Sequence, residues 1–207
     1  MNLSIITLMI TLFLGGGPKG PPDRPAGKDQ VVIIHTSFGD ISLLLYDKTP
    51  KHKANFLKLA EEGYYDGTTF HRIIDNFMIQ GGDPNTKDDD KTNDGLGGPD
   101  YSVPAEFVKE LTHKQGVVAA AREPDRSNPE KASSGSQFYI VENKEGYHSL
   151  DGNYTVFGEV IKGIEVVEKI AEQKKDRRNK PLKDIKMTVT IKKMSKKKIQ
   201  KVYAYTY

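Results

Sequence analysis

The stretch from Thr68 to Asp83, TTFHRIIDNFMIQGGD, gathers side chains that could do chemistry. It sets one arginine, Arg72, among aromatic and β-branched residues. In an extended segment successive side chains alternate between two faces, so Arg72 shares its face with Phe70 and Ile74. A guanidinium on an apolar face either pairs with a carboxylate inside the fold or offers its rigid fork of donors to a ligand. The spacing alone leaves both interpretations open.

Other kinds of site leave little trace in the sequence. The absence of cysteine excludes disulfides, thiolate metal sites and cysteine nucleophiles. SSGSQ (133–137) lacks the second glycine of a serine nucleophile elbow. The acidic loop KDDDKTNDG does not fit a calcium loop, and the five histidines lack the spacing of metal ligands. GLGGPD does not match a nucleotide-binding fingerprint, so neither a metal nor a cofactor is expected.

The charge balance also argues against a nucleic-acid partner. The chain of 207 residues carries 31 Lys and Arg against 28 Asp and Glu, a formal net charge of +3. This excess is too small to indicate a polyanionic partner by itself, so no nucleic acid is expected. The length suits one domain with tails.

The N-terminus differs in kind from the rest of the chain. Leu3–Leu14 is almost continuously apolar, but it is shorter than the roughly 20 residues that a membrane-spanning helix needs. We therefore expect residues 1–17 to be a signal peptide or an N-terminal anchor, and the protein to be exported. Membrane association through residues 3–14 is the alternative. Residues 18–29 read as a Gly/Pro-rich linker, and residues 194–207 as a basic, Tyr-rich, solvated tail.

The segment between linker and tail, residues 30–193, predicts one mainly β domain. Val31–His35 and Asp40–Tyr46 indicate a hairpin that turns at Gly39. A helix is expected to follow, with Thr49 as its N-cap, and a second helix over 164–173. Short strand-like runs separated by polar loops, without regular β-α alternation, favour a closed or nearly closed antiparallel barrel with helices outside it.

The opening stretch resembles a family signature. FHRIIDNFMIQGGDP is similar to the motif of cyclophilin-type peptidyl-prolyl isomerases, and the resemblance continues through GVVAAAR, SGSQFYI and LDGNYTVFGEV in the family's order. It covers roughly residues 30–193. The resemblance implies a closed eight-stranded antiparallel β-barrel capped by two α-helices, no cofactor, and catalysis of rotation about X-Pro peptide bonds in proline-containing polypeptides.

The resemblance also implies roles for ten residues. Arg72 would donate a hydrogen bond to the twisted amide, and Gln80 would fix the substrate backbone and orient Arg72. Tyr139 stands where the family usually has Phe on the pocket floor, and Tyr154 where many members have His. Ala121 would support the residue before proline. The other expected substrate-binding residues are Phe77, Met78, Arg122, Gln137 and Leu150.

Some properties remain open at this stage. Ser149 stands where cyclosporin-sensitive members carry Trp, so weak or no cyclosporin binding is expected. A non-catalytic module that binds proline peptides is the main alternative, because Tyr139 and Tyr154 alter the pocket. A second alternative is an anchored scaffold whose basic tail binds anionic lipid. A monomer is the default expectation.

Overall fold

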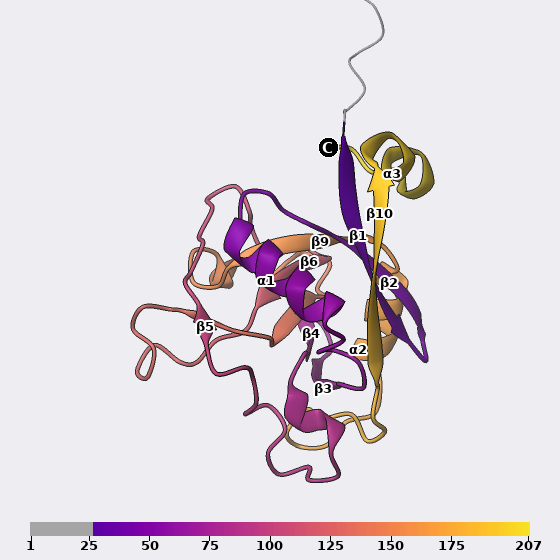
Figure 1. The fold of residues 1–207 in the computed structure, drawn as a ribbon. Coiled ribbons are helices and arrows are strands. Elements are labelled where there is room, and N and C mark those ends of the chain that lie inside the picture. The colour runs from indigo at the N-terminus through magenta and orange to yellow at the C-terminus, as the bar shows by residue number, and fades with distance from the viewer. Residues whose placement is uncertain (1–26) are drawn as a thin grey trace, which may run out of the picture.

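The computed structural model describes residues 27–207, so the predictions for residues 1–17 and for most of the linker lie outside the described residues. The fold is mainly β, as predicted (Figure 1). Its strands and helices in chain order are β1 (Lys28–Thr36), β2 (Gly39–Leu45), α1 (Pro50–Glu61), β3 (Phe70–Ile74), β4 (Met78–Gly81), η1 (Pro84–Lys87), β5 (Ser102–Val103), β6 (Val117–Ala120), β7 (Ser133–Ser134), β8 (Phe138–Val141), η2 (His148–Leu150), β9 (Val156–Lys162), α2 (Ile164–Ala171), β10 (Met187–Ser195) and α3 (Lys196–Tyr203).

Eight strands form one antiparallel sheet in the order β10-β1-β2-β9-β6-β8-β4-β3, but the expected closed barrel is wrong. A single bridge, Thr69 to Lys186, links the residues that lead into the edge strands β3 and β10. Further along β3 the amide of Ile73 donates instead to the carbonyl of Asn179, at 2.8 Å. Asn179 has a positive φ of 64°, and Pro181 lacks an amide, so this segment cannot continue as a strand. We call residues 174–186 the seam loop.

The inside of the curled sheet is filled by one apolar core. Its centre holds aromatic rings from several elements, with Phe56 of α1 4.8 Å from Tyr65 and 5.4 Å from Phe138 of β8, measured between ring centroids. All three side chains are buried. Burying rings of this size supplies a large part of the apolar area removed from water. This core holds β3, β4 and β8 in fixed register.

Helix α1 begins at Pro50, as its sequence predicted, but a distant residue caps it. Thr49 occupies the N-cap position and its side chain makes no cap hydrogen bond. The carboxylate of Glu106 accepts hydrogen bonds from the amides of Lys51 and His52, at 3.1 and 3.0 Å. A negative charge is favourable at a helix N-terminus, so Glu106 does the work expected of Thr49. The loop before β6 is thereby attached to α1.

The double glycine that ends the opening stretch has a steric cause. Gly82 has a positive φ of 87°, a conformation that other residues rarely adopt. A Cβ atom added there would lie 2.5 Å from the carbonyl oxygen of Ser136. Only glycine therefore lets the chain turn out of β4 this close to the segment that leads into β8.

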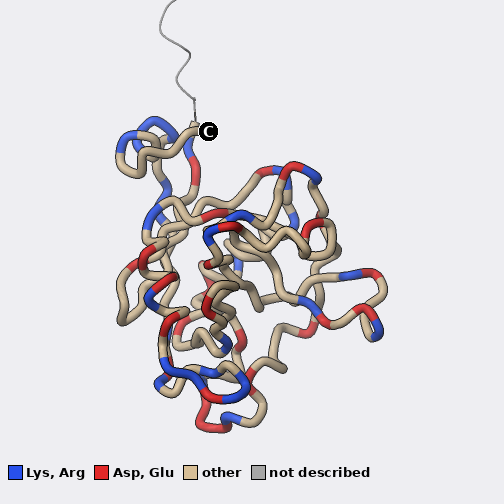
Figure 2. The backbone as a smooth tube through the Cα atoms, turned by 180° about the vertical axis from the view of Figure 1, so that it is seen from behind, with Lys and Arg blue, Asp and Glu red and all other residues tan. Residues whose placement is uncertain are grey.

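The C-terminal segment differs from the solvated tail that we expected. Strand β10 continues to Ser195, whose side chain caps α3 by accepting a hydrogen bond from the amide of Lys198. Ile199 of α3 is fully buried against Val31, Ile33 and Leu44 on the outer face of the sheet. The lysines of α3 remain at the surface, where Figure 2 shows them as a blue cluster beside the C-terminus.

The helices of the described part of the chain are all short. Between residues 27 and 207, none combines the length and the apolar character that crossing a bilayer would require.

Candidate active site

One cavity of about 360 Å³ collects most of the residues that the sequence singled out. We call it the cup. Its register explains the arrangement, because Arg72 of β3 lies opposite Gln80 of β4, which lies opposite Tyr139 of β8. Side chains directly opposite on neighbouring strands share a face of the sheet. The cup is lined by Arg72, Phe77, Met78, Gln80, Ala121, Arg122, Tyr139, Tyr147, Leu150 and Tyr154.

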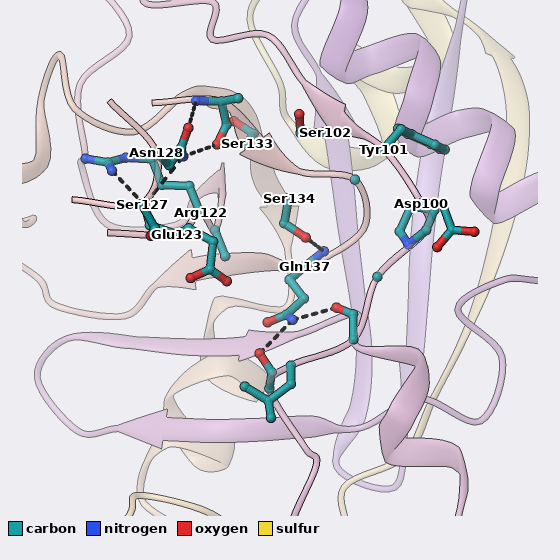
Figure 3. A pocket seen from close by; sticks show the side chains of 18 of the residues that line it. Asp100, Tyr101, Ser102, Arg122, Glu123, Ser127, Asn128, Ser133, Ser134 and Gln137 are labelled. Atoms are coloured by element: carbon teal, nitrogen blue, oxygen red, sulfur yellow. Dashed lines mark hydrogen bonds between the residues drawn. The ribbon is translucent and has the colours of Figure 1, made fainter. Parts of the chain in front are cut away.

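A chain of hydrogen bonds holds Arg72 at the mouth of the cup. Its Nη1 donates to Oε1 of Gln80 at 3.1 Å, and Nε2 of Gln80 donates to Oε1 of Gln137 at 3.0 Å. Nε2 of Gln137 then donates to the carbonyls of Gly95 and Gly97, at 3.0 and 2.8 Å (Figure 3). We call this chain the glutamine relay. It fixes the guanidinium through neutral partners and so leaves its charge uncompensated.

The electrostatic setting of Arg72 favours a ligand over a structural ion pair. Among residues 27–207 no carboxylate lies within ion-pair distance of its guanidinium. Burial lowers the pKa of Arg72, although the neighbouring Tyr154 opposes this shift. Arginine still stays protonated at neutral pH, because its ordinary pKa is far above 7. The sequence left open that Arg72 pairs with a carboxylate inside the fold. The described residues provide no such carboxylate.

The floor of the cup rests on a buried polar network. The hydroxyl of Tyr139 lies 2.8 Å from Nε2 of His113, and Nδ1 of His113 lies 2.7 Å from Oδ1 of Asp151. His148 reaches the other oxygen of Asp151, at 2.9 Å. Burial lowers the pKa of His113, so its ring is neutral at pH 7. Nδ1–H therefore donates to Asp151, and Nε2 accepts from the Tyr139 hydroxyl.

This network shows what the unusual tyrosine does. The Tyr139 hydroxyl is directed to His113, beneath the cup, and burial raises the pKa of Tyr139 well above its usual range. Burial alone would raise the pKa of Asp151, but hydrogen bonds from His113 and His148 lower it on balance. The ring of Tyr139 thus remains as the apolar floor while its polar atom is satisfied inside the fold.

The rim of the cup is held by Arg122. Its guanidinium lies 4.5 Å from the centre of the Tyr154 ring, and its Nε donates to the carbonyl of Asn153 at 2.8 Å. Its Nη1 also contacts Asp125 at 2.6 Å. Since this side chain is 5 % exposed and fully engaged, Arg122 acts as a wall that keeps Tyr154 in place.

The structure brings all ten predicted residues to one region, and all except Gln137 line the cup. Gln137 instead lines an adjoining cavity of about 580 Å³, which shares Gln80, Ala121 and Arg122 with the cup (Figure 3). The predicted contact between Gln80 and Arg72 is present. Both polar atoms of the Gln80 side chain are engaged in the glutamine relay, which suits positioning of Arg72 more than binding of the substrate backbone.

Sequence reasoning missed Tyr147. Its ring packs on Phe77 with 4.2 Å between the ring centroids, and it lines the cup where Ser149 does not. The signal was an aromatic residue two positions before Ser149, which stands in place of the family's Trp. No cluster of three or more potential metal ligands occurs within residues 27–207.

Comparisons with known proteins identify the family of this chain. A family model described as "Cyclophilin type peptidyl-prolyl cis-trans isomerase/CLD" matches residues 31–191. The peptidyl-prolyl cis-trans isomerase CYP18-2 of Arabidopsis thaliana is 35% identical over 172 residues, which cover 81% of this chain and 96% of that protein. The putative peptidyl-prolyl cis-trans isomerase of Staphylococcus saprophyticus is 36% identical and is covered to 89%.

Solved structures agree with the sequence relatives. The crystal structure of the Cryptosporidium parvum cyclophilin type peptidyl-prolyl cis-trans isomerase cgd2_1660 superposes with a TM-score of 0.69 at 31% identity, covering 79% of this chain and 97% of that chain. A second crystal structure of the same protein, in the presence of the dipeptide Ala-Pro, has a TM-score of 0.67. The chain belongs to the cyclophilin family and is a peptidyl-prolyl cis-trans isomerase.

Proposed function

We propose that the cup binds the proline ring of the substrate and that Arg72 is the catalytic donor. The observation that carries this proposal is the charge of Arg72, which the glutamine relay holds in the wall of the cup, without a carboxylate partner among residues 27–207. The crystal structure of the Cryptosporidium relative in the presence of the dipeptide Ala-Pro supports a proline-containing ligand for this fold.

The reaction needs electrostatic help and no covalent chemistry. An X-Pro bond rotates over a barrier of about 18–20 kcal/mol, because resonance between the carbonyl and the imide nitrogen must be broken. In the twisted state the nitrogen regains its lone pair. A guanidinium N–H directed at that lone pair stabilises the transition state more than either planar ground state. Each 1.36 kcal/mol removed from the barrier gives about a tenfold faster rotation.

The other residues of the cup have separate roles in binding the substrate. Phe77, Met78 and Leu150 supply apolar contacts for the proline ring, and Tyr139 forms the floor beneath it. The residue before proline extends over Ala121 toward the adjoining cavity, which shares Ala121 with the cup. Since the ring is fixed while the preceding carbonyl turns, the rotation passes beside Arg72.

The test compares two arginine variants of the full chain. NMR exchange spectroscopy on a short X-Pro peptide measures cis-to-trans exchange with the wild type, with Arg72→Ala and with Arg126→Ala as a matched control on an exposed loop. Removing a transition-state donor typically costs about 10²–10³ in rate. We expect this loss for Arg72→Ala and none for the control.

The same experiment distinguishes catalysis from binding alone. If the wild type binds the peptide without accelerating exchange, the chain is a non-catalytic proline-peptide module on the isomerase fold. An equal loss of rate in both variants would instead refute the assigned role of Arg72. The bonding of the Tyr139 hydroxyl to His113 favours catalysis, because it leaves the ring of Tyr139 as an apolar floor for the proline.

Export, oligomeric state and inhibitor binding belong to the proposal as well. The apolar run Leu3–Leu14 supports a role in protein folding outside the cytoplasm or at a membrane. Cell fractionation of the full chain, with N-terminal sequencing of the recovered protein, tests this; recovery of uncut chain in the cytoplasm would contradict it. We expect a monomer by light scattering. Weak cyclosporin binding follows from Ser149, and a tight dissociation constant in a titration would overturn it.

A further inference from the structure

A third cavity, of about 190 Å³, adjoins the cup at Arg72 and Gln80. It is lined by His71, Arg72, Gln80, Lys91, Asp94, Gly95, Arg178 and Lys180. We call it the basic cavity. It shares Arg72 and Gln80 with the cup, so a peptide seated in the cup passes beside it. Two loops form its outer wall, namely residues 88–101 and the seam loop.

The two loops are joined by ion pairs that leave positive charge in excess. Lys180 pairs with Asp94, and Lys91 contacts Asp184 at 2.9 Å. These pairs leave Arg72 and Arg178 as the uncompensated cations of the cavity. Within residues 27–207 no carboxylate pairs with the Arg178 side chain. The carboxylate of Asp94 faces the cavity, but Lys180 neutralises it, so the cavity as a whole favours an anion.

His71 provides a second, independent sign of a ligand. It is 6 % exposed, and neither ring nitrogen makes a well-formed hydrogen bond among the described residues, although the backbone of Thr69 is close enough to favour the charged ring. Burial lowers the pKa of His71, which leaves a neutral ring with one N–H donor at pH 7. Buried polar atoms normally have partners, so this donor calls for an acceptor inside the cavity.

The order of the strands tells which part of a peptide reaches this cavity. Arg72 lies on the edge strand β3, and β4 and β8 separate it from β6, which leads into Ala121. With the residue before proline over Ala121, the residue after proline extends over the β3 edge. This placement brings it to the cavity that His71 and Arg178 line.

We propose that the basic cavity binds the acidic side chain of a residue that follows the proline, and so gives this isomerase a preference for Pro-Glu and Pro-Asp sequences. The inference rests on the proposed function of the cup. A carboxylate at this place pairs with the Arg178 guanidinium, beside the ring of His71. A phosphate group shares this chemistry and is tested separately.

The experiment measures a ratio of rates, so it stands apart from the basal activity. NMR exchange spectroscopy with the full chain compares two blocked peptides, Ala-Ala-Pro-Glu and Ala-Ala-Pro-Gln, which differ only in charge. Partly exposed charge pairs contribute modestly, so we expect kcat/KM to be about two- to fivefold higher for the Glu peptide at low salt. The ratio should shrink toward one at about 0.5 M salt, because screening shortens the range of these interactions.

Two arginine variants locate the effect. Arg178→Gln should remove most of the preference, whereas Arg177→Gln, which removes the same charge one residue away and outside the cavity, should keep it. An equal effect of both variants would reduce the preference to net charge and overturn the inference. Equal rates for the two peptides with an active enzyme would overturn it too. If neither peptide is turned over, the proposed function itself fails.

A position control and a free anion complete the design. Ala-Glu-Pro-Ala should show no preference over Ala-Gln-Pro-Ala, because its carboxylate precedes the proline; an equal preference would refute the assigned direction. Inorganic phosphate, at an ionic strength matched with chloride, should lower the rate for the Glu peptide only. Equal inhibition of the Gln peptide would show that the cavity serves a free anion and not a client side chain.

Discussion

Replacing Tyr139 with phenylalanine removes one hydroxyl from beneath the cup and restores the residue usual in cyclophilins, yet the structure predicts a less stable protein. In the wild type this hydroxyl donates to Nε2 of His113, whose side chain is fully buried. The variant leaves that nitrogen without a donor. His113 cannot move its proton to Nε2 instead, because Nδ1–H already donates to Asp151.

The size of the effect follows from the burial of His113. Leaving a buried polar atom unsatisfied costs about 1–3 kcal/mol. For a domain of this size each kcal/mol lowers the melting temperature by about 2–4 °C, so the expected loss is about 2–12 °C. Tyr154→Phe is the matched control, because no hydrogen bond is made by the Tyr154 hydroxyl among the described residues.

Urea unfolding at pH 7.5 measures both variants against the wild type. We expect the midpoint to fall for Tyr139→Phe and to stay within about 0.5 kcal/mol equivalent for Tyr154→Phe. The ¹⁵N shifts of the His113 ring give a second readout, since loss of the donor changes the environment of Nε2. Equal stability of Tyr139→Phe and wild type, or an equal loss in both variants, would refute the account of the polar network.

Two further predictions concern stability. Ile199→Ala should lower the free energy of unfolding in urea by about 2–4 kcal/mol, because Ile199 is fully buried. Val202→Ala, on the exposed side of α3, should lower it by less than about 0.5 kcal/mol. Equal effects would show that α3 does not pack on the sheet. Three buried histidines have pKa values lowered by burial, so below pH 6.5 the unfolded chain binds more protons than the folded one and stability should fall between pH 7 and 5. The three histidines are His52, His71 and His113. Burial raises the pKa of Glu142, which opposes the effect, but it is one group against three. An unchanged or higher urea midpoint at pH 5.5 would contradict the assignment.

The sequence predicted the local features of the fold well because their signals are local. Pro50 at the first position of α1 and the turn at Gly39 can be read from adjacent residues. Helix α3 has a local signal too, the Ser195 cap, but its lysines led us to expect a solvated tail. The three neighbouring apolar residues that receive Ile199 lie more than 150 positions earlier, so its burial was invisible from the sequence alone.

Features that depend on distant parts of the chain were the ones missed. Glu106 caps α1 from more than 50 residues away. The glutamine relay joins Gln80 to Gln137 and then to two loop carbonyls, which no spacing rule would pair. The resemblance supplied the identities of the cup residues, whereas the partner of the Tyr139 hydroxyl required the structure. Closure of the barrel failed for the same reason, because it depends on how the seam loop returns to β3.

The seam loop also affects how readily the protein aggregates. Strand β3 carries Arg72 and is the last strand of the sheet, and an unpaired edge of this kind can recruit a strand from another chain. The outward-facing amide of Ile73 donates to the carbonyl of Asn179, and the seam loop around Asn179 carries charged side chains. The loop therefore shields β3 against edge-to-edge aggregation. Amide hydrogen exchange at Ile73 should detect brief opening of the seam loop, because this opening exposes the edge of β3.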